Sequence, residues 1–280
     1  MRWVRYHAAT IVAASLVFFS LNGGSISASE PVVPYTDSSC EEADYLRWVS
    51  GDKHCFAIRT FIPTKMVARP ILRIYIHGDV RRGGPVTRMY HYALLTPSAV
   101  VSVALLRPGN WDHEGRQSTN KSYGSLGDET AEDIDEIATA VRRLKERHKA
   151  SRVVMIGHSG GANISAVMLG RHPGVADAAL LAGPACDKIA KARHRNRRVR
   201  DEDLSPIDYV DKIPLNAKII AITGSRDNTN PASICEPYFA RLKERGVSAR
   251  LEIVEGVKHG FRRLARSDAY KDGLAELESE

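Results

Sequence analysis

The sequence predicts an α/β fold in which a mostly parallel central sheet is covered by helices on both faces. Apolar runs and helical segments alternate from residue 71 to the end of the chain, as in proteins built from parallel strands and crossover helices. Several runs are continuously apolar, which is typical of strands buried on both faces. The chain has 280 residues, of which 43% are hydrophobic and 26% are charged. This composition suits one globular domain.

The first predicted elements are strands. Residues 54–63 (HCFAIRTFIP) and 71–76 (ILRIYI) are rich in β-branched and aromatic side chains, and 99–106 (AVVSVALL) is almost wholly apolar. Such residues favour strands. A helix is predicted at 85–95. Residues 107–127 then form a long irregular loop, and loops of that length are usually functional or mobile.

The clearest helix in the sequence spans residues 130–148. Its apolar residues fall on one helical face, namely Ile134, Ile137, Ala138, Val141 and Leu144. Its first turns are acidic and its last turn is basic, as the helix dipole favours. A buried strand at 153–156 and a helix at 162–170 are predicted to follow.

The last third of the chain continues the alternation, with strands at 178–182, 218–223 and 249–254 and helices at 232–245 and 267–280. A cap-like insertion occupies about 187–214. Its segment DKIAKARHRNRRVRDED (187–203) holds seven Lys or Arg residues. Such a basic insertion suits acidic acyl groups, sugar acids or an anionic envelope surface. The alternative is a solvated, mobile segment with no role in substrate binding.

Residues 1–28 have the layout of a secretory signal peptide. Arg2 and Arg5 give a positive start, an apolar run follows, and small polar residues lead to Ala28. The run is shorter than the ~20 residues that span a bilayer. We therefore expect cleavage, a mature domain of residues 29–280, and export to the periplasm or the medium. The alternative is an uncleaved anchor, which would be the expected site of membrane contact.

All four cysteines lie after this segment, at Cys40, Cys55, Cys186 and Cys235. An even number in an exported chain suggests disulfide bonds, and three pairings are possible. Cys40 with Cys55 would close a short loop, and Cys186 with Cys235 would join two loops at one end of the sheet. The alternative is buried free thiols.

The stretch VVMIGHSGGAN (153–163) contains a GxSxG motif between a predicted strand and a predicted helix. In a nucleophile elbow of this kind, the serine sits on a strained turn between the two elements. The surrounding glycines allow close approach of the backbone. Ser159 is therefore a candidate nucleophile, and the alternative is a small residue in a glycine-rich turn.

A histidine and an acid follow two later strands. Asp227 comes after 218–223, and His259 comes after 249–254. Both are expected at the carboxyl edge of the sheet, where parallel sheets place their sites. His259 can take the serine proton because histidine titrates near neutrality, and Asp227 would orient the imidazole. Asp187 is the rival acid.

An oxyanion hole needs two backbone N–H donors. Gly160 follows the nucleophile and is the first candidate, and Asp79, with Gly78 beside it, is the second. Negative charge beside an oxyanion is unfavourable. We therefore expect the Asp79 carboxylate to turn away, toward Arg81 or Arg82.

Three further residues are candidates for lining the substrate pocket, namely His77, Trp111 and His158. The alternative for Trp111 is simple packing, and for His158 it is stacking under the elbow. The chain has no H-E-x-x-H motif and no paired Cys-x-x-Cys motif, so no metal is expected. Its net charge of +7 comes without a nucleic-acid recognition motif, so no nucleic-acid partner is expected.

The motifs together resemble the α/β-hydrolase superfamily, specifically its single-domain members similar to the prolyl oligopeptidase and dienelactone hydrolase branch. The resemblance is carried by Ile76-His77-Gly78, Arg107-Pro108-Gly109, the glycine-rich stretch 157–161, Ser205 to Tyr209 (SPIDY), Gly224 with Asp227, and His259-Gly260-Phe261. It implies an α/β-hydrolase fold and a serine hydrolase that works through an acyl-enzyme without a cofactor. Ser159, Asp227 and His259 correspond to the catalytic triad.

We expect an exported serine hydrolase whose substrate is a small carboxylic ester. A second candidate is a peptidase or amidase of the prolyl oligopeptidase type that acts on short peptides. Prolyl oligopeptidases carry a large β-propeller for which this chain has no room, so gating of that kind is not expected. An acyltransferase and a non-catalytic binding protein on the same fold are the third and fourth candidates.

Overall fold

The computed structural model describes residues 40, 44–80, 85–86, 93, 99–119, 130–198 and 204–279. The chain divides into Met1–Pro31 and Val32–Glu280. The first unit, which contains the whole predicted signal peptide, lies outside the described residues, as does most of the predicted helix 85–95. No helix within the described ranges has the length and apolar character needed to cross a membrane.

The described part of Val32–Glu280 is built on an eight-stranded sheet with the order β1-β2-β4-β3-β5-β6-β7-β8. Its strands are β1 (Trp48–Ser50), β2 (Cys55–Phe61), β3 (Ile71–Ile76), β4 (Val100–Leu105), β5 (Arg152–His158), β6 (Ala178–Ala182), β7 (Lys218–Gly224) and β8 (Ser248–Val254). Strands β1–β2 and β2–β4 pair antiparallel, and the other pairs are parallel. The predicted mostly parallel α/β fold is therefore confirmed. Strand β1 was not predicted, because three residues are too few for a periodic signal.

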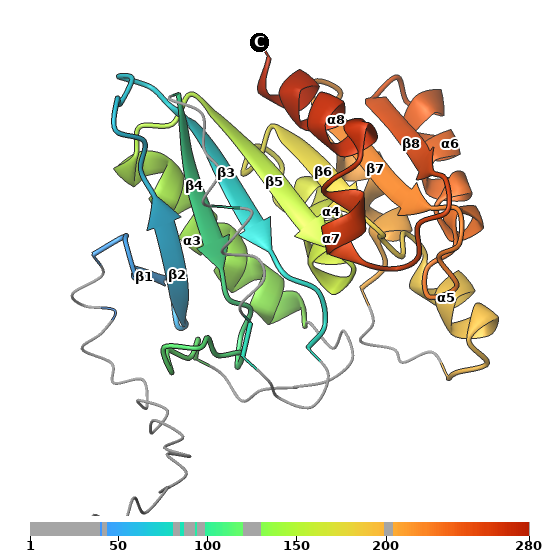
Figure 1. The fold of residues 1–280 in the computed structure, drawn as a ribbon, viewed down its shortest axis with the longest axis horizontal. Helices are drawn as coiled ribbons and strands as arrows, with labels where there is room; N and C mark the ends of the chain where they lie inside the picture. The colour runs from blue at the N-terminus through green and yellow to red at the C-terminus, as the bar shows by residue number, and fades with distance from the viewer. Residues whose placement is uncertain are drawn as a thin grey trace, which may run out of the picture. The chain divides into compact units, whose positions relative to one another are not determined.

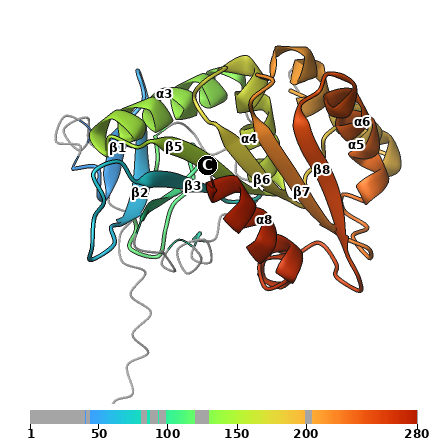
Figure 2. The same ribbon diagram turned by 90° about the horizontal axis from the view of Figure 1, so that it is seen from above.

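Helices cover both faces of this sheet, as Figure 2 shows with α3 and α6 on one side and α8 on the other. The first face carries α3 (Ala131–Arg147), α4 (Gly160–Arg171), the 3-10 helix η2 (Pro206–Lys212) and α6 (Glu236–Glu244). The second carries α7 (Phe261–Leu264) and α8 (Asp268–Glu278). Burial of the two apolar layers is the main force that holds these helices on the sheet.

Two helical segments differ from the prediction. The single helix expected at 232–245 is divided into a 3-10 turn, η3 (Ala232–Ile234), and α6. Pro237 lies in the first turn of α6, where the backbone N–H that proline lacks would have no partner within the helix. In the interior of one continuous helix over 232–245, the same proline would remove a hydrogen bond. The four-residue helix α7 was not predicted, since one turn is too short to show helical periodicity.

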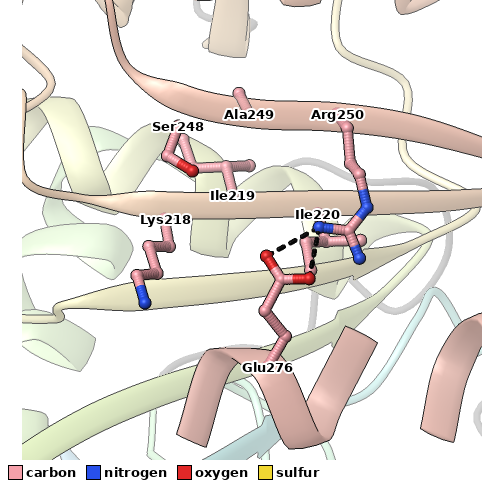
Figure 3. A pocket seen from close by; sticks show the side chains of 7 residues that line it. All are labelled: Lys218, Ile219, Ile220, Ser248, Ala249, Arg250 and Glu276. Carbon is pink, nitrogen blue, oxygen red and sulfur yellow. Dashed lines mark hydrogen bonds and ion pairs between the residues drawn. The ribbon is translucent and has the colours of Figure 1, made fainter. Parts of the chain in front are cut away.

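The parallel strands give the sheet two different edges. At the amino-terminal ends of β7 and β8, a small pocket is lined by residues that include Lys218, Ser248 and Glu276, and Arg250 bonds Glu276 of α8 across it (Figure 3). The loops that follow β3, β5, β6, β7 and β8 leave the opposite, carboxyl edge (Figure 1). The candidate site lies at that edge.

Candidate active site

Ser159 occupies a one-residue turn between β5, which ends at His158, and α4, which begins at Gly160. Its backbone has φ 52° and ψ −115°, a conformation that costs a non-glycine residue on the order of 1–3 kcal/mol. A backbone hydrogen bond helps to hold it there, since the Ser159 N–H donates to the Ala182 carbonyl at 2.9 Å. The turn is tighter than the five-residue turn that the sequence suggested.

The glycines around Ser159 are required by space. A Cβ on Gly157 would lie 2.3 Å from the carbonyl oxygen of Gly161, and one on Gly161 would lie 2.2 Å from that of Ile76. Any side chain at these two positions would push the start of α4 away from β3 and β5. The glycines therefore hold the serine turn against the sheet.

Ser159, His259 and Asp227 form a continuous chain of hydrogen bonds. The His259 Nε2 atom lies 3.0 Å from Ser159 Oγ, and Nδ1 lies 2.7 Å from Asp227 Oδ2. A carboxylate only accepts hydrogen bonds. The Nδ1–H therefore donates to Asp227, and Nε2 is left to accept the serine hydroxyl. The Asp227 side chain is 0% exposed and that of His259 is 18% exposed.

Further contacts fix the Asp227 carboxylate. Its Oδ1 accepts the backbone N–H groups of Thr229 and Asn230, each at 2.9 Å. The Asn230 side chain donates to the Gly183 carbonyl at 2.8 Å, which joins the loop after β7 to the loop after β6. Asp187, the rival acid, instead caps helix α5 (Lys188–His194).

Gly183 packs against the same pair. Its φ is +58°, and a Cβ there would lie 3.2 Å from Nδ1 of His259. The sequence prediction missed both Gly183 and Asn230. An asparagine three residues after Asp227 is a turn signal, but nothing in the sequence indicates that it bonds to Gly183.

The loop after β3 passes beside the serine. A Cβ on Gly78 would lie 3.1 Å from the Cβ of Ser159, and one on Gly160 would lie 2.2 Å from Oδ1 of Asp79. Within the described ranges, no backbone carbonyl accepts a hydrogen bond from the N–H of Gly160 or Asp79. Their role as oxyanion donors stays a prediction.

Residues 98–275 match the prolyl oligopeptidase family. The chain belongs to this family. The match confirms the family branch that the sequence motifs indicated. No curated protein matches the chain significantly by sequence.

Solved structures show the same fold as this prolyl oligopeptidase family member. An acylaminoacyl peptidase from Pyrococcus horikoshii matches with a TM-score of 0.67 and 14% identity over 83% of this chain and 41% of its own. The chain thus spans about two fifths of that peptidase. Est1E from Butyrivibrio proteoclasticus, solved with ferulic acid bound, matches at 0.62 and 16% over 83% of this chain and 99% of its own. A Pyrococcus furiosus esterase matches at 0.60 and 15% over 82% and 89%.

The Asp79 carboxylate was expected to turn toward Arg81 or Arg82, and because both arginines lie outside the described residues this stays a prediction. The carboxylate lies against Gly160 and pairs with Arg107 at 2.9 Å. Burial alone would raise the pKa of Asp79, but Arg107, with Lys191 and Lys188, holds it below its ordinary value. The carboxylate is therefore ionised at neutral pH, and its charge is balanced by the guanidinium.

Both ring nitrogens of His77 form hydrogen bonds with backbone groups. Its Nε2 accepts the N–H of Arg107 at 3.1 Å, so Nδ1 carries the proton and donates to the Gly78 carbonyl at 2.7 Å. Burial, with Arg107 nearby, lowers its pKa to about 3. This neutral ring joins the loops after β3 and β4, which differs from the expected place in a substrate pocket.

His158 stacks beneath the site, with its ring centre 5.2 Å from that of His259 and 5.4 Å from that of Phe261. Burial and the neighbouring His259 lower its pKa to about 3, and its buried Nε2 has no hydrogen-bond partner among the described residues. Trp111 forms an isolated bridge with Gln117. Its expected place in the substrate pocket stays a prediction.

Two disulfide bonds join the four cysteines as Cys40–Cys55 and Cys186–Cys235. The second bond links the residue before Asp187 to the start of α6. It therefore fixes the root of the predicted insertion close to the loop that contains Asp227. Within the described residues, no cluster of His, Cys, Asp and Glu could hold a metal ion.

Proposed function

We propose that this protein is an exported serine hydrolase that cleaves carboxylic esters through Ser159, His259 and Asp227. The observation that supports the proposal is the hydrogen-bond chain from Ser159 Oγ through the imidazole to the buried Asp227 carboxylate. A serine hydroxyl is a weak nucleophile at neutral pH, and a positioned general base is what activates it.

In the proposed mechanism, Ser159 Oγ attacks the ester carbonyl while its proton moves to Nε2 of His259. Asp227 stabilises the resulting imidazolium. The negative oxygen of the tetrahedral intermediate accepts hydrogen bonds from the N–H groups of Gly160 and Asp79. His259 then gives the proton to the leaving alcohol, and an acyl-enzyme remains. Water attacks the acyl group with His259 as base, which releases the acid and restores the serine.

The choice of ester over amide is supported by two structural relatives. Est1E and the Pyrococcus furiosus esterase are similar to this chain over most of their own lengths. The acylaminoacyl peptidase has a higher TM-score than either esterase. Peptidase activity is therefore the second candidate function. Both activities use the same acyl-enzyme chemistry, so the leaving group decides between them.

The test is covalent labelling of the mature protein with a fluorophosphonate, followed by intact mass. We expect one adduct on the native protein and none on Ser159→Ala. Hydrolysis of 4-nitrophenyl butyrate and of the matched 4-nitroanilide then separates ester from amide preference. A folded native protein that takes no label would contradict the proposal and favour a binding protein on this fold.

Export is part of the same proposal, and it is supported by the composition of residues 1–28 and by the two disulfide bonds. Disulfides form and persist in oxidising compartments. Amino-terminal sequencing of the exported protein is expected to begin at Ser29. An intact amino terminus on a membrane-bound protein would contradict cleavage.

A further inference from the structure

The ion pair between Asp79 and Arg107 lies directly against Gly160, the residue that follows the nucleophile. The Arg107 Nη1 atom donates to Asp79 Oδ1 at 2.9 Å. A Cβ placed on Gly160 would lie 2.2 Å from that oxygen and 2.8 Å from Nη1. The pair therefore occupies the space that a side chain on Gly160 would need. The side chains of Arg107 and Asp79 are 9% and 19% exposed, so water and salt screen their charges only weakly.

The backbone of Arg107 is held independently of its side chain. Its N–H donates to Nε2 of His77 at 3.1 Å, and Nδ1 of the same ring donates to the Gly78 carbonyl at 2.7 Å. These bonds join the loops after β3 and β4 without using the guanidinium. A substitution that shortens or neutralises the side chain at position 107 therefore leaves them in place and changes the charge beside Asp79.

That charge matters because of where the oxyanion is expected. Gly160 and Asp79 are the predicted N–H donors, so an oxyanion bound by them would form close to the Asp79 carboxylate. Two negative charges in a poorly solvated site repel each other strongly. The Arg107 guanidinium supplies an opposite charge on the carboxylate itself. The stabilisation of an oxyanion at this place therefore depends on the ion pair as well as on the two donors.

We propose that Arg107 is a positioning residue of the hydrolase, which acts by pairing with Asp79 and cancelling the carboxylate charge beside Gly160. The inference rests on the proposed function, because an oxyanion forms only when Ser159 attacks a carbonyl group. It predicts an asymmetry that a purely structural ion pair would not show. Loss of the carboxylate charge is tolerated, whereas loss of the guanidinium leaves a buried negative charge beside the oxyanion.

The kinetic test uses hydrolysis of 4-nitrophenyl butyrate. Arg107→Met is expected to lower kcat and kcat/KM together by on the order of 10²-fold with KM nearly unchanged, because the loss falls on the transition state. Asp79→Asn keeps the backbone N–H and removes the charge, so its kcat should stay within about five-fold of the native value. Adding Asp79→Asn to Arg107→Met should restore kcat by about ten-fold or more. Arg107→Lys, which keeps the positive charge, should retain more activity than Arg107→Met.

Arg73 provides a matched control for the loss of a buried guanidinium. It lies near the start of β3, away from the carboxyl end of that strand, and it pairs with Glu278 of α8. The two side chains are 5% and 13% exposed, so this pair is at least as buried as the one at the site. Arg73→Met should lower the stability measured by urea unfolding and leave kcat within about two-fold of the native value.

The double variant keeps the test decisive if Arg107→Met alone does not fold. In the Asp79→Asn background, Arg107→Met leaves no buried carboxylate behind and should cost less than about five-fold in kcat. A loss of on the order of 10²-fold in that background would overturn the inference. So would a kcat for folded Arg107→Met no lower than that of Arg73→Met, and in either case the proposed function would stand. A native protein that hydrolyses no ester and takes no fluorophosphonate would overturn the proposed function, and this inference with it.

Discussion

The Nδ1 atom of His259 lies 2.7 Å from Oδ2 of Asp227, although the two residues come from separate loops that follow neighbouring strands. In the proposed mechanism this pairing gives Asp227 two roles, since it selects the tautomer of His259 and stabilises the imidazolium that forms during attack. Asp187 has no such contact, because its carboxylate caps α5.

Asp227→Asn is therefore expected to lower kcat/KM by on the order of 10³- to 10⁴-fold, since an amide in place of the carboxylate favours the wrong tautomer. The measurement is ester hydrolysis at neutral pH, with circular dichroism to check the fold. Asp187→Asn is the matched control and should change kcat/KM only a few-fold, because asparagine also caps helices. A larger loss of kcat/KM for Asp187→Asn than for Asp227→Asn would mean that Asp187, and not Asp227, is the catalytic acid.

Gly183 offers a second test of the same pair. Alanine at this position would strain a backbone with φ +58° and place a Cβ 3.2 Å from the His259 ring. We expect Gly183→Ala to lower kcat at least ten-fold through displacement of the imidazole, in addition to destabilising the fold by about 1 kcal/mol.

Gly174 provides the control for backbone strain. It also has a positive φ, of +85°, but a Cβ there would meet nothing within 4 Å. Gly174→Ala should therefore lose comparable stability in urea unfolding and keep its kcat. Equal losses of kcat in the two variants would mean that general destabilisation, and not contact with His259, explains the effect.

The meeting of Ser159, Asp227 and His259 follows from the sequence, whereas the partner of Asp79 does not. Parallel strands end at one edge of a sheet, so residue types after β5, β7 and β8 were enough to predict that Ser159, Asp227 and His259 meet. The partner of Asp79 could not be predicted in this way. Its ion pair with Arg107 joins the loops after β3 and β4, and a contact between residues 28 positions apart depends on tertiary packing that local patterns do not contain.

The buried histidines predict how stability depends on pH. The pKa of His158 is lowered to about 3, whereas an unfolded histidine titrates near 6.5. Between these values the unfolded chain binds more protons than the folded one, so the free energy of unfolding falls as the pH drops from about 6.5 toward 3. His77 contributes in the same direction, because its pKa is also about 3.

His158→Phe should flatten this dependence. The aromatic ring keeps contact with Phe261, and no proton is taken up at this position on unfolding. We expect the loss of unfolding free energy between pH 7 and pH 4.5 to be smaller than in the native protein by on the order of 2 kcal/mol. Urea unfolding at the two pH values measures it. An unchanged loss would show that His158 is not held neutral in the folded state.

The two disulfide bonds are expected to differ in their effect on activity. Cys186–Cys235 has a sequence separation of 49 and Cys40–Cys55 one of 15, so the chain-entropy model gives each a stabilisation of about 3–4 kcal/mol. Cys186 also holds the root of α5 beside the Asp227 loop. Replacing Cys186 and Cys235 by serine should therefore raise KM several-fold as well as lowering Tm. The Cys40→Ser, Cys55→Ser variant should lower Tm and leave KM unchanged below its melting range. If both variants raise KM equally, the Cys186–Cys235 bond has no particular role in positioning the site.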